Sequence, residues 1–196
     1  MLILGHIPDL SLIIFLDVPY SELTAFLETL PDSQFSGSSQ FSWYHGYERS
    51  RLDTVVTGSY SGAWVAAGQF IGQFIQADLG AVRRVEKVAT QGRPDFDHWV
   101  TSYRFAYSVD GLTYHFILSN TGSEQIFAGN SDRDTVVENT FDMAVAARYV
   151  RVYPQTWHTG LSIRWEVYGR DIGETVYIFE LSLVGYMLAL VVKMFT

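Results

Sequence analysis

Between residues 32 and 169 the sequence alternates between apolar and polar side chains, and it contains no long segment with a helical period. Successive side chains of a β-strand point to opposite faces, so such a pattern predicts strands with an apolar inner face and a polar outer face. Short runs of this kind lie at 74–80, 104–111, 112–118 and 147–154, the last of which should end at Pro154. In the clearest run, Leu161, Ile163, Trp165 and Val167 alternate with Ser162, Arg164, Glu166 and Tyr168. The chain is therefore expected to be an all-β, antiparallel β-sandwich in which Ile75, Leu79, Ile163, Trp165 and Val167 are buried.

Composition narrows the classes of protein and partner. The chain has 196 residues, of which 48% are hydrophobic and 17% charged, which is typical of one folded domain. A formal net charge of -8 argues against a nucleic-acid partner. The absence of cysteine excludes disulfides, thiolate zinc sites and cysteine nucleophiles. It is compatible with a reducing compartment but does not require one.

The two ends of the chain differ from the middle. Residues 1–30 carry an apolar run at 10–16, which resembles part of a signal peptide but lacks preceding Lys or Arg; the alternatives are an irregular leader or a short amphipathic helix over 19–30. Residues 171–196 are strongly apolar, although Glu180 lies within them and a spanning helix needs about 20 apolar residues. We interpret this tail as a possible membrane segment, a packed extra element or a non-native extension. A central domain over 31–170 remains.

A set of motifs occurs in order along this domain: DSQFSGSSQF (32–41), ERSRLD (48–53), GAW (62–64), FIQADLG (74–80), QGRPDFDHWVTSY (91–103), GNSDRDT (129–135) and ARYVRVYPQTWHTGLSIRWEVYG (147–169). Together they resemble the discoidin domain, also called the coagulation factor V/VIII type C domain. DHWVTSY is closest to the discoidin lectins, and TWHTGLSIRWEVYG is similar to the neuropilin version. The resemblance implies a jelly-roll sandwich with galactose-binding-like topology, an extracellular or cell-surface location, no enzymatic activity, and ligand binding by loops, called spikes, at one end.

The chain departs from this family where the ends of the domain should be joined by a disulfide. Arg170 follows Gly169 in place of the family's cysteine, and no cysteine precedes Asp32. The ends must then be held by packing and by backbone hydrogen bonds. We expect the segments around Asp32 and Tyr168 to pair.

The resemblance places the first spike at 41–51, the second at 66–73 and the third at 91–103. In the third spike, charged planar groups and an aromatic ring lie within seven residues, a combination that suits the hydroxyls and the C–H face of a sugar. Alternatively, the two aspartates cap backbone amides of the loop, and the tryptophan belongs to the core. The candidate ligand-binding residues are Trp43, Tyr44, Phe70, Ile71, Arg93, Asp95, Asp97 and Trp99.

These residues favour a glycan or glycoprotein as the partner. Apolar side chains at the spike tips suit an anionic phospholipid surface instead, but acidic neighbours offset Arg49, Arg51 and Arg93. A protein or collagen partner is a third alternative. The acidic cluster at 129–135 could hold Ca²⁺ or could contain a turn-shaping salt bridge of Arg133. His158 is expected on a loop near the opposite end of a strand, and enzyme signatures are absent.

Overall fold

A computed structural model describes residues 11–13, 22–172, 176–184 and 187–195. Residues Leu23–Asp171 form one compact unit built almost entirely from antiparallel strands. Its strands are β2 (Thr24–Ala25), β3 (Phe35–Gly37), β4 (Trp64–Val65), β5 (Ile75–Gln91), β6 (Trp99–Ser108), β7 (His115–Phe116), β8 (Phe127–Ala128), β9 (Val137–His158) and β10 (Ser162–Asp171). Three short 3₁₀ helices, η1 (Asp32–Gln34), η2 (Trp43–His45) and η3 (Tyr47–Ser50), lie before β4.

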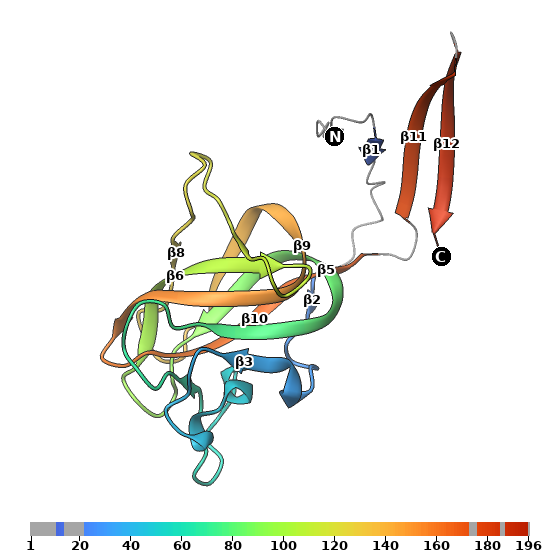
Figure 1. Cartoon of the computed structure of the whole chain (residues 1–196). Coiled ribbons are helices and arrows are strands. Elements are labelled where there is room, and N and C mark those ends of the chain that lie inside the picture. The colour runs from blue at the N-terminus through green and yellow to red at the C-terminus, as the bar shows by residue number, and fades with distance from the viewer. Residues whose placement is uncertain (1–10, 14–21, 173–175, 185–186, 196) are drawn as a thin grey trace. The chain divides into compact units, whose positions relative to one another are not determined.

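The strands follow the order β2-β10-β5-β9-β6-β7, while β3, β4 and β8 add to the side of this path. The long strands β5 and β9 pair over most of their length, but the register of the pairing shifts twice, and both ribbons curve strongly (Figure 1). Such irregularities let one strand bend around a core. The predicted antiparallel jelly-roll sandwich is confirmed.

The core lies where the alternation predicted it. Ile75, Leu79, Ile163, Trp165 and Val167 are all fully buried, as expected from their spacing. The hairpin expected over 104–118 is also present, because β7 pairs with β6. Pro154 does not end its strand, however: β9 continues to His158. The ladder register of β6 shifts opposite Pro154, so that the missing N–H donor falls in an irregular part of the sheet.

The polar side of β10 differs from the prediction. Ser162, Arg164 and Glu166 were expected to face solvent, yet all three are buried. Glu166 lies under the N-terminal segment of the domain, and Arg164 lies under loops that converge from three parts of the chain. The alternation of apolar and polar residues identifies the two faces of a strand, but it does not show whether other parts of the chain cover the polar face as well.

The N-terminal end of the domain begins earlier than residue 31. Residues 22–30 form β2 and turns rather than the predicted helix, and residues 19–21 lie outside the described part. Ala25 pairs with Tyr168, and Phe26 and Leu27 join the core. The two ends of the domain therefore pair as expected, but Tyr168 pairs with β2 and not with the segment around Asp32. The apolar side chains at helical spacing are instead used to fill the core.

Strands outside this unit form a separate antiparallel sheet in the order β1-β11-β12, with β1 at Ser11–Ile13, β11 at Val176–Val184 and β12 at Met187–Phe195. Most of the predicted leader, at 1–10 and 14–21, lies outside the described residues, as do positions 173–175, 185–186 and 196 of the tail. Within the part that the structure describes, no helix is long and apolar enough to span a membrane.

Candidate functional site

The three predicted spikes meet at one end of the sandwich, where they enclose a shallow pocket of about 180 Å³. A fourth loop, between β9 and β10, completes the wall. The pocket is lined by Phe41 of the first spike, the adjoining Val65 with Ala66, Ala67 and Gln69 of the second, Arg93 and His98 of the third, and Gly160 and Leu161 of the fourth loop. Residues that are far apart in sequence thus share one concave surface, which is typical of a ligand site.

Arg93 is the most constrained polar group of this pocket. Arg93 is only 7% exposed to solvent. Its guanidinium donates two hydrogen bonds to the Asp95 carboxylate, one from Nε at 3.0 Å and one from Nη2 at 2.7 Å. The guanidinium also stacks on the ring of Phe96, with 4.1 Å between the guanidinium carbon and the ring centroid. Among the described residues, none accepts a hydrogen bond from Nη1. Arg93 is therefore a fixed hydrogen-bond donor at the pocket wall, although it lies in a loop.

The Asp95 carboxylate is fixed by the same pair. Burial acts to raise the pKa of Asp95, but the hydrogen bonds and the charge of Arg93 outweigh it and hold this pKa below its ordinary value. Gly62 lies against the same loop, and a Cβ added there would be 2.3 Å from a Pro94 ring carbon. The loop therefore packs closely on the GAW motif, and this contact requires glycine.

Two histidines flank Arg93. His98 lines the pocket with its ring against Gly160, where an added Cβ would be 2.4 Å from His98 Nδ1, and that nitrogen is buried without a hydrogen-bond partner. His45 shares a 2.8 Å hydrogen bond with Ser42 Oγ. Burial and then the charge of Arg93 lower the pKa of both imidazoles. Both rings are thus held in the neutral form around pH 7.

An aromatic cluster marks the tip of the first spike. Trp43, which is 62% exposed, packs on Tyr44 and on Tyr60, with ring centroids 4.7 and 5.3 Å apart. Tyr60 was not among the predicted site residues; it is the central residue of GSYSG (58–62), in a loop outside the three spikes. Only its aromatic character in a Gly- and Ser-rich loop could have indicated it.

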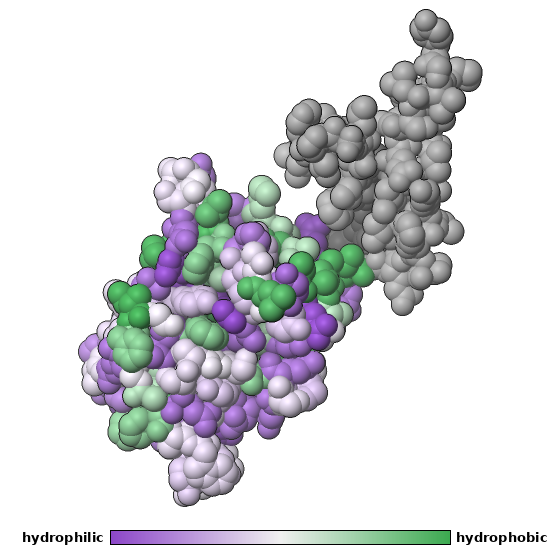
Figure 2. All heavy atoms as spheres, in the orientation of Figure 1, coloured by the Kyte–Doolittle hydropathy of each residue, from purple (hydrophilic) through white to green (hydrophobic). Residues whose placement is uncertain are grey.

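The tip of the second spike is apolar and open to solvent. Phe70 is 60% exposed and Ile71 is 64% exposed, so neither is an inward residue of the next strand. Figure 2 shows hydrophobic side chains on the left edge of the domain, among mostly hydrophilic neighbours. Phe41 and Phe96, which belong to the other two spikes, are also exposed. The spike end therefore presents several separated apolar tips around the pocket.

Asp97 and Trp99 lie apart from this pocket, on a second hollow of about 410 Å³ beside the 129–135 loop. Asp97 pairs with Arg133 at 2.8 Å, and the hydrogen bond and charge of Arg133 lower the pKa of Asp97. The Trp99 ring stacks on His158 with 4.2 Å between centroids and 10° between planes. The prediction for His158 was wrong: it lies at the spike end, because the last residue of β9 pairs with the first residue of β6.

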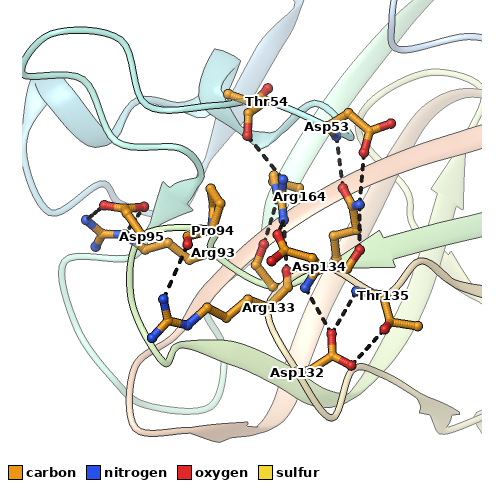
Figure 3. Close-up of polar contacts among 12 residues, drawn as sticks. Asp53, Thr54, Arg93, Pro94, Asp95, Asp132, Arg133, Asp134, Thr135 and Arg164 are labelled. Atoms are coloured by element: carbon orange, nitrogen blue, oxygen red, sulfur yellow. Dashed lines mark hydrogen bonds and ion pairs between the residues drawn. The ribbon is translucent and has the colours of Figure 1, made fainter.

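The carboxylates considered for Ca²⁺ have other partners. Asp132 accepts hydrogen bonds from the backbone N–H groups of Asp134 and Thr135, and Asp134 pairs with Arg164 at 3.1 Å (Figure 3). No cluster of three or more acidic, histidine or cysteine side chains that could hold a metal occurs in the described residues. The alternative of a turn-shaping salt bridge at Arg133 agrees with the structure, since Arg133 joins this loop to Asp97.

Arg164 of β10 positions these loops, although sequence reasoning assigned it to a solvent-facing side. It is 3% exposed and donates hydrogen bonds to the backbone oxygens of Gly92 at 2.7 Å, Arg133 at 2.8 Å and Thr54 at 3.1 Å (Figure 3). One guanidinium thus ties three loops to the central strand. Its role depends on contacts across 31 to 110 residues of sequence, which no local pattern reveals.

Comparison with known proteins gives consistent matches. The family model for the F5/8 type C domain matches residues 34–167. Mouse (Mus musculus) lactadherin is 38% identical over 151 residues, which are 72% of this chain and 31% of lactadherin. Mouse retinoschisin is 32% identical over 158 residues, 77% of this chain and 69% of retinoschisin.

Among solved structures, recombinant discoidin II of Dictyostelium discoideum superposes with a TM-score of 0.69 and 27% identity, covering 79% of this chain and 61% of that one. The chain spans about a third or less of the length of several curated relatives that it matches, lactadherin among them. The family match nevertheless covers more than half of the chain and includes β3 to β9, the first part of β10 and all three spikes. The chain belongs to the F5/8 type C, or discoidin, domain family.

Proposed function

We propose that the domain is a non-enzymatic, extracellular ligand-binding module that recognises carbohydrate of galactose type in the pocket between the three spikes. The observation that carries the proposal is the composition of the pocket wall. One exposed aromatic ring, Phe41, lies beside the hydrogen-bonding side chains of Gln69, Arg93 and His98. A ring for the C–H face of a sugar and planar donors for its hydroxyls are the groups that carbohydrate recognition requires.

The held geometry of Arg93 supports this proposal further. A free arginine side chain loses rotamer entropy when it binds a ligand, which costs about 0.5–1.5 kcal/mol. Arg93 is already fixed by Asp95 and Phe96, so its Nη1 group can donate to a hydroxyl without that cost. The lowered pKa of His98 keeps this ring able to accept a hydrogen bond at neutral pH.

An anionic phospholipid surface is the second candidate ligand, and the exposed tips Trp43, Phe70 and Ile71 favour it. A basic collar would be needed beside these tips, because each basic residue near an anionic membrane contributes about 1 kcal/mol. Arg49 and Arg51 are not free to supply one. Both donate to backbone carbonyl groups, and Arg51 also pairs with Asp32. A protein partner, collagen included, would use the same tips.

A glycan array run beside sedimentation with phosphatidylserine liposomes tests the choice. The wild-type chain should bind galactose-terminated glycans, and Arg93→Ala should weaken that binding about ten- to a hundredfold, since it removes a charged hydrogen-bond donor. Phe70→Ala tests the apolar tip, and Leu112→Ala serves as its control because Leu112 is exposed in the loop that follows the C-terminal end of β6. Binding to liposomes but to no glycan, with loss in Phe70→Ala alone, would replace the carbohydrate proposal with the lipid one.

A further inference from the structure

The third spike separates two hollows. His98 lines the pocket shared by the three spikes, and the next residue, Trp99, lines the hollow beside the 129–135 loop. Trp99 is the first residue of β6, and in extended backbone successive side chains point to opposite sides. The consecutive residues His98 and Trp99 therefore line two neighbouring concave surfaces on either side of the third spike.

The second hollow contains the same kinds of groups as the first. Its aromatic wall is Trp99, which is half-buried and held in one orientation by the stacked ring of His158. Its rim carries the Asp97–Arg133 pair, whose side chains are 65% and 39% exposed. Arg133 also donates to the Pro94 carbonyl oxygen at 3.4 Å, so it reaches across to the third spike. An aromatic ring beside an exposed, charged hydrogen-bonding pair suits a sugar ring with its hydroxyls.

Other groups in this hollow are used by the fold. The Asp132 carboxylate accepts three hydrogen bonds within its own loop, including one from the Thr135 hydroxyl, and Asp134 pairs with the buried Arg164. These bonds hold the loop in place against β10. The groups left for a ligand are thus Trp99, Asp97 and Arg133. The charges of Asp97 and Arg133 cancel, which disfavours a purely anionic or cationic ligand.

We propose that the hollow beside Trp99 is a second sugar subsite, so that the domain recognises a glycan of two or more sugar units lying across the third spike. This inference rests on the carbohydrate function proposed for the first pocket. It adds that the preferred ligand is an oligosaccharide and that Asp97, Trp99 and Arg133 set the preference for length.

Isothermal titration calorimetry of the full chain with galactose, lactose and a galactose-terminated tetrasaccharide tests this inference. The tetrasaccharide should bind at least about tenfold more tightly than galactose. Arg133→Ala should reduce this ratio about three- to tenfold, and Trp99→Leu should do the same through loss of ring stacking. Leu112→Ala should keep the wild-type ratio. Far-ultraviolet circular dichroism and the melting temperature would show that each variant is folded.

The outcomes separate this inference from the proposed function. Equal affinity for galactose and the tetrasaccharide would overturn the second subsite while leaving the first intact. An unchanged ratio in both Arg133→Ala and Trp99→Leu would also overturn it. Failure of the wild-type chain to bind any of the three sugars would overturn the carbohydrate function itself.

Discussion

Arg93 and Asp95 form an ion pair with two hydrogen bonds, of 3.0 and 2.7 Å, at the wall of the pocket between the spikes. The pair lies within a single loop of seven residues, 92–98, that also closes on itself through a 2.9 Å hydrogen bond from the Arg93 N–H to the His98 carbonyl oxygen. The site and the conformation of its main loop thus depend on the same two side chains.

Arg93→Lys should weaken binding and also lower stability. Lysine keeps the charge but cannot make the two parallel hydrogen bonds, so we expect about a tenfold loss of galactose affinity and a cost of about 1–3 kcal/mol in unfolding free energy. Calorimetric titration and urea denaturation would measure the two effects. Arg104→Lys is the control for binding, because Arg104 also pairs with a carboxylate, that of Glu124, but lines neither pocket. A wild-type unfolding free energy in Arg93→Lys would contradict the structural role given to the pair.

Glu166→Gln should destabilise the domain through its N-terminal end. Glu166 Oε1 accepts hydrogen bonds from the N–H groups of Phe26 and Leu27, and Oε2 accepts one from Glu28. A glutamine amide nitrogen cannot accept these bonds, which leaves a buried N–H unpaired at a cost of about 1–3 kcal/mol. At about 2–4 °C per kcal/mol, the melting temperature should fall by roughly 2–12 °C.

Glu138→Gln is the matched control for this carboxylate, since its pair with Lys87 is half-exposed and its loss should change the melting temperature by less than about 2 °C. Equal effects of the two substitutions would show that Glu166 does not hold the N-terminal segment. In that case, the end of the domain would be held by the pairing of β2 with β10 and by the burial of Phe26 and Leu27.

Acidification should weaken the fold from about pH 6.5 downward. Burial, followed by the charge of Arg93, lowers the pKa of His45 and His98 in the folded state. Below the ordinary histidine pKa of about 6.5 the unfolded chain then binds more protons than the folded one, so stability decreases as the pH falls. Melting temperatures between pH 8 and pH 5 would test this: they should be flat above about 7 and should decrease below it.

His98→Gln should make the decrease of the melting temperature below pH 7 less steep, because the buried ring beside Gly160 would no longer take up a proton on unfolding, whereas His45 still would. The negative charges of Asp95 and Asp97 act to raise the pKa of His98, whereas the charge of His158 acts with that of Arg93 to lower it. The pKa values of the Asp95 and Asp97 carboxylates are also lowered, so these two groups would titrate well below the range of pH 5 to 8. A melting temperature that rises on acidification to pH 5 would refute the assignment.

Removal of residues 176–196 should leave the domain folded. The compact unit ends at Asp171, and its core residues all lie between 26 and 167. The truncated chain should unfold in one cooperative transition within about 2 °C of the full chain. Loss of cooperativity in differential scanning calorimetry would mean that the tail contributes to the core.

Local patterns predicted the parts of this protein that depend on neighbouring residues. The buried face of β10, with Trp165 between Ile163 and Val167, follows from alternation alone. The other face could not be inferred, because Arg164 and Glu166 are covered by segments distant in sequence. The spike positions came from motif order, and the structure brings the three spikes together as expected.

The details of the site were less accessible to sequence reasoning. Arg93 is buried although it lies in a loop, because its side chain folds back onto Asp95 and Phe96 within the same loop. His158 was assigned to the wrong end, since only the pairing of β9 with β6 places it on Trp99. Neither the burial of Arg93 nor the place of His158 follows from a local pattern, because both depend on the tertiary path of the chain.

The central claim is that carbohydrate binds in the pocket between the three spikes. An NMR titration of the ¹⁵N-labelled chain, using the best glycan from the array, tests it most directly. The account predicts saturable amide shifts at Phe41, Gln69, His98 and Gly160, and none in the hairpin around Leu112. Shifts confined to surfaces away from these residues, or no shifts at millimolar glycan, would contradict it.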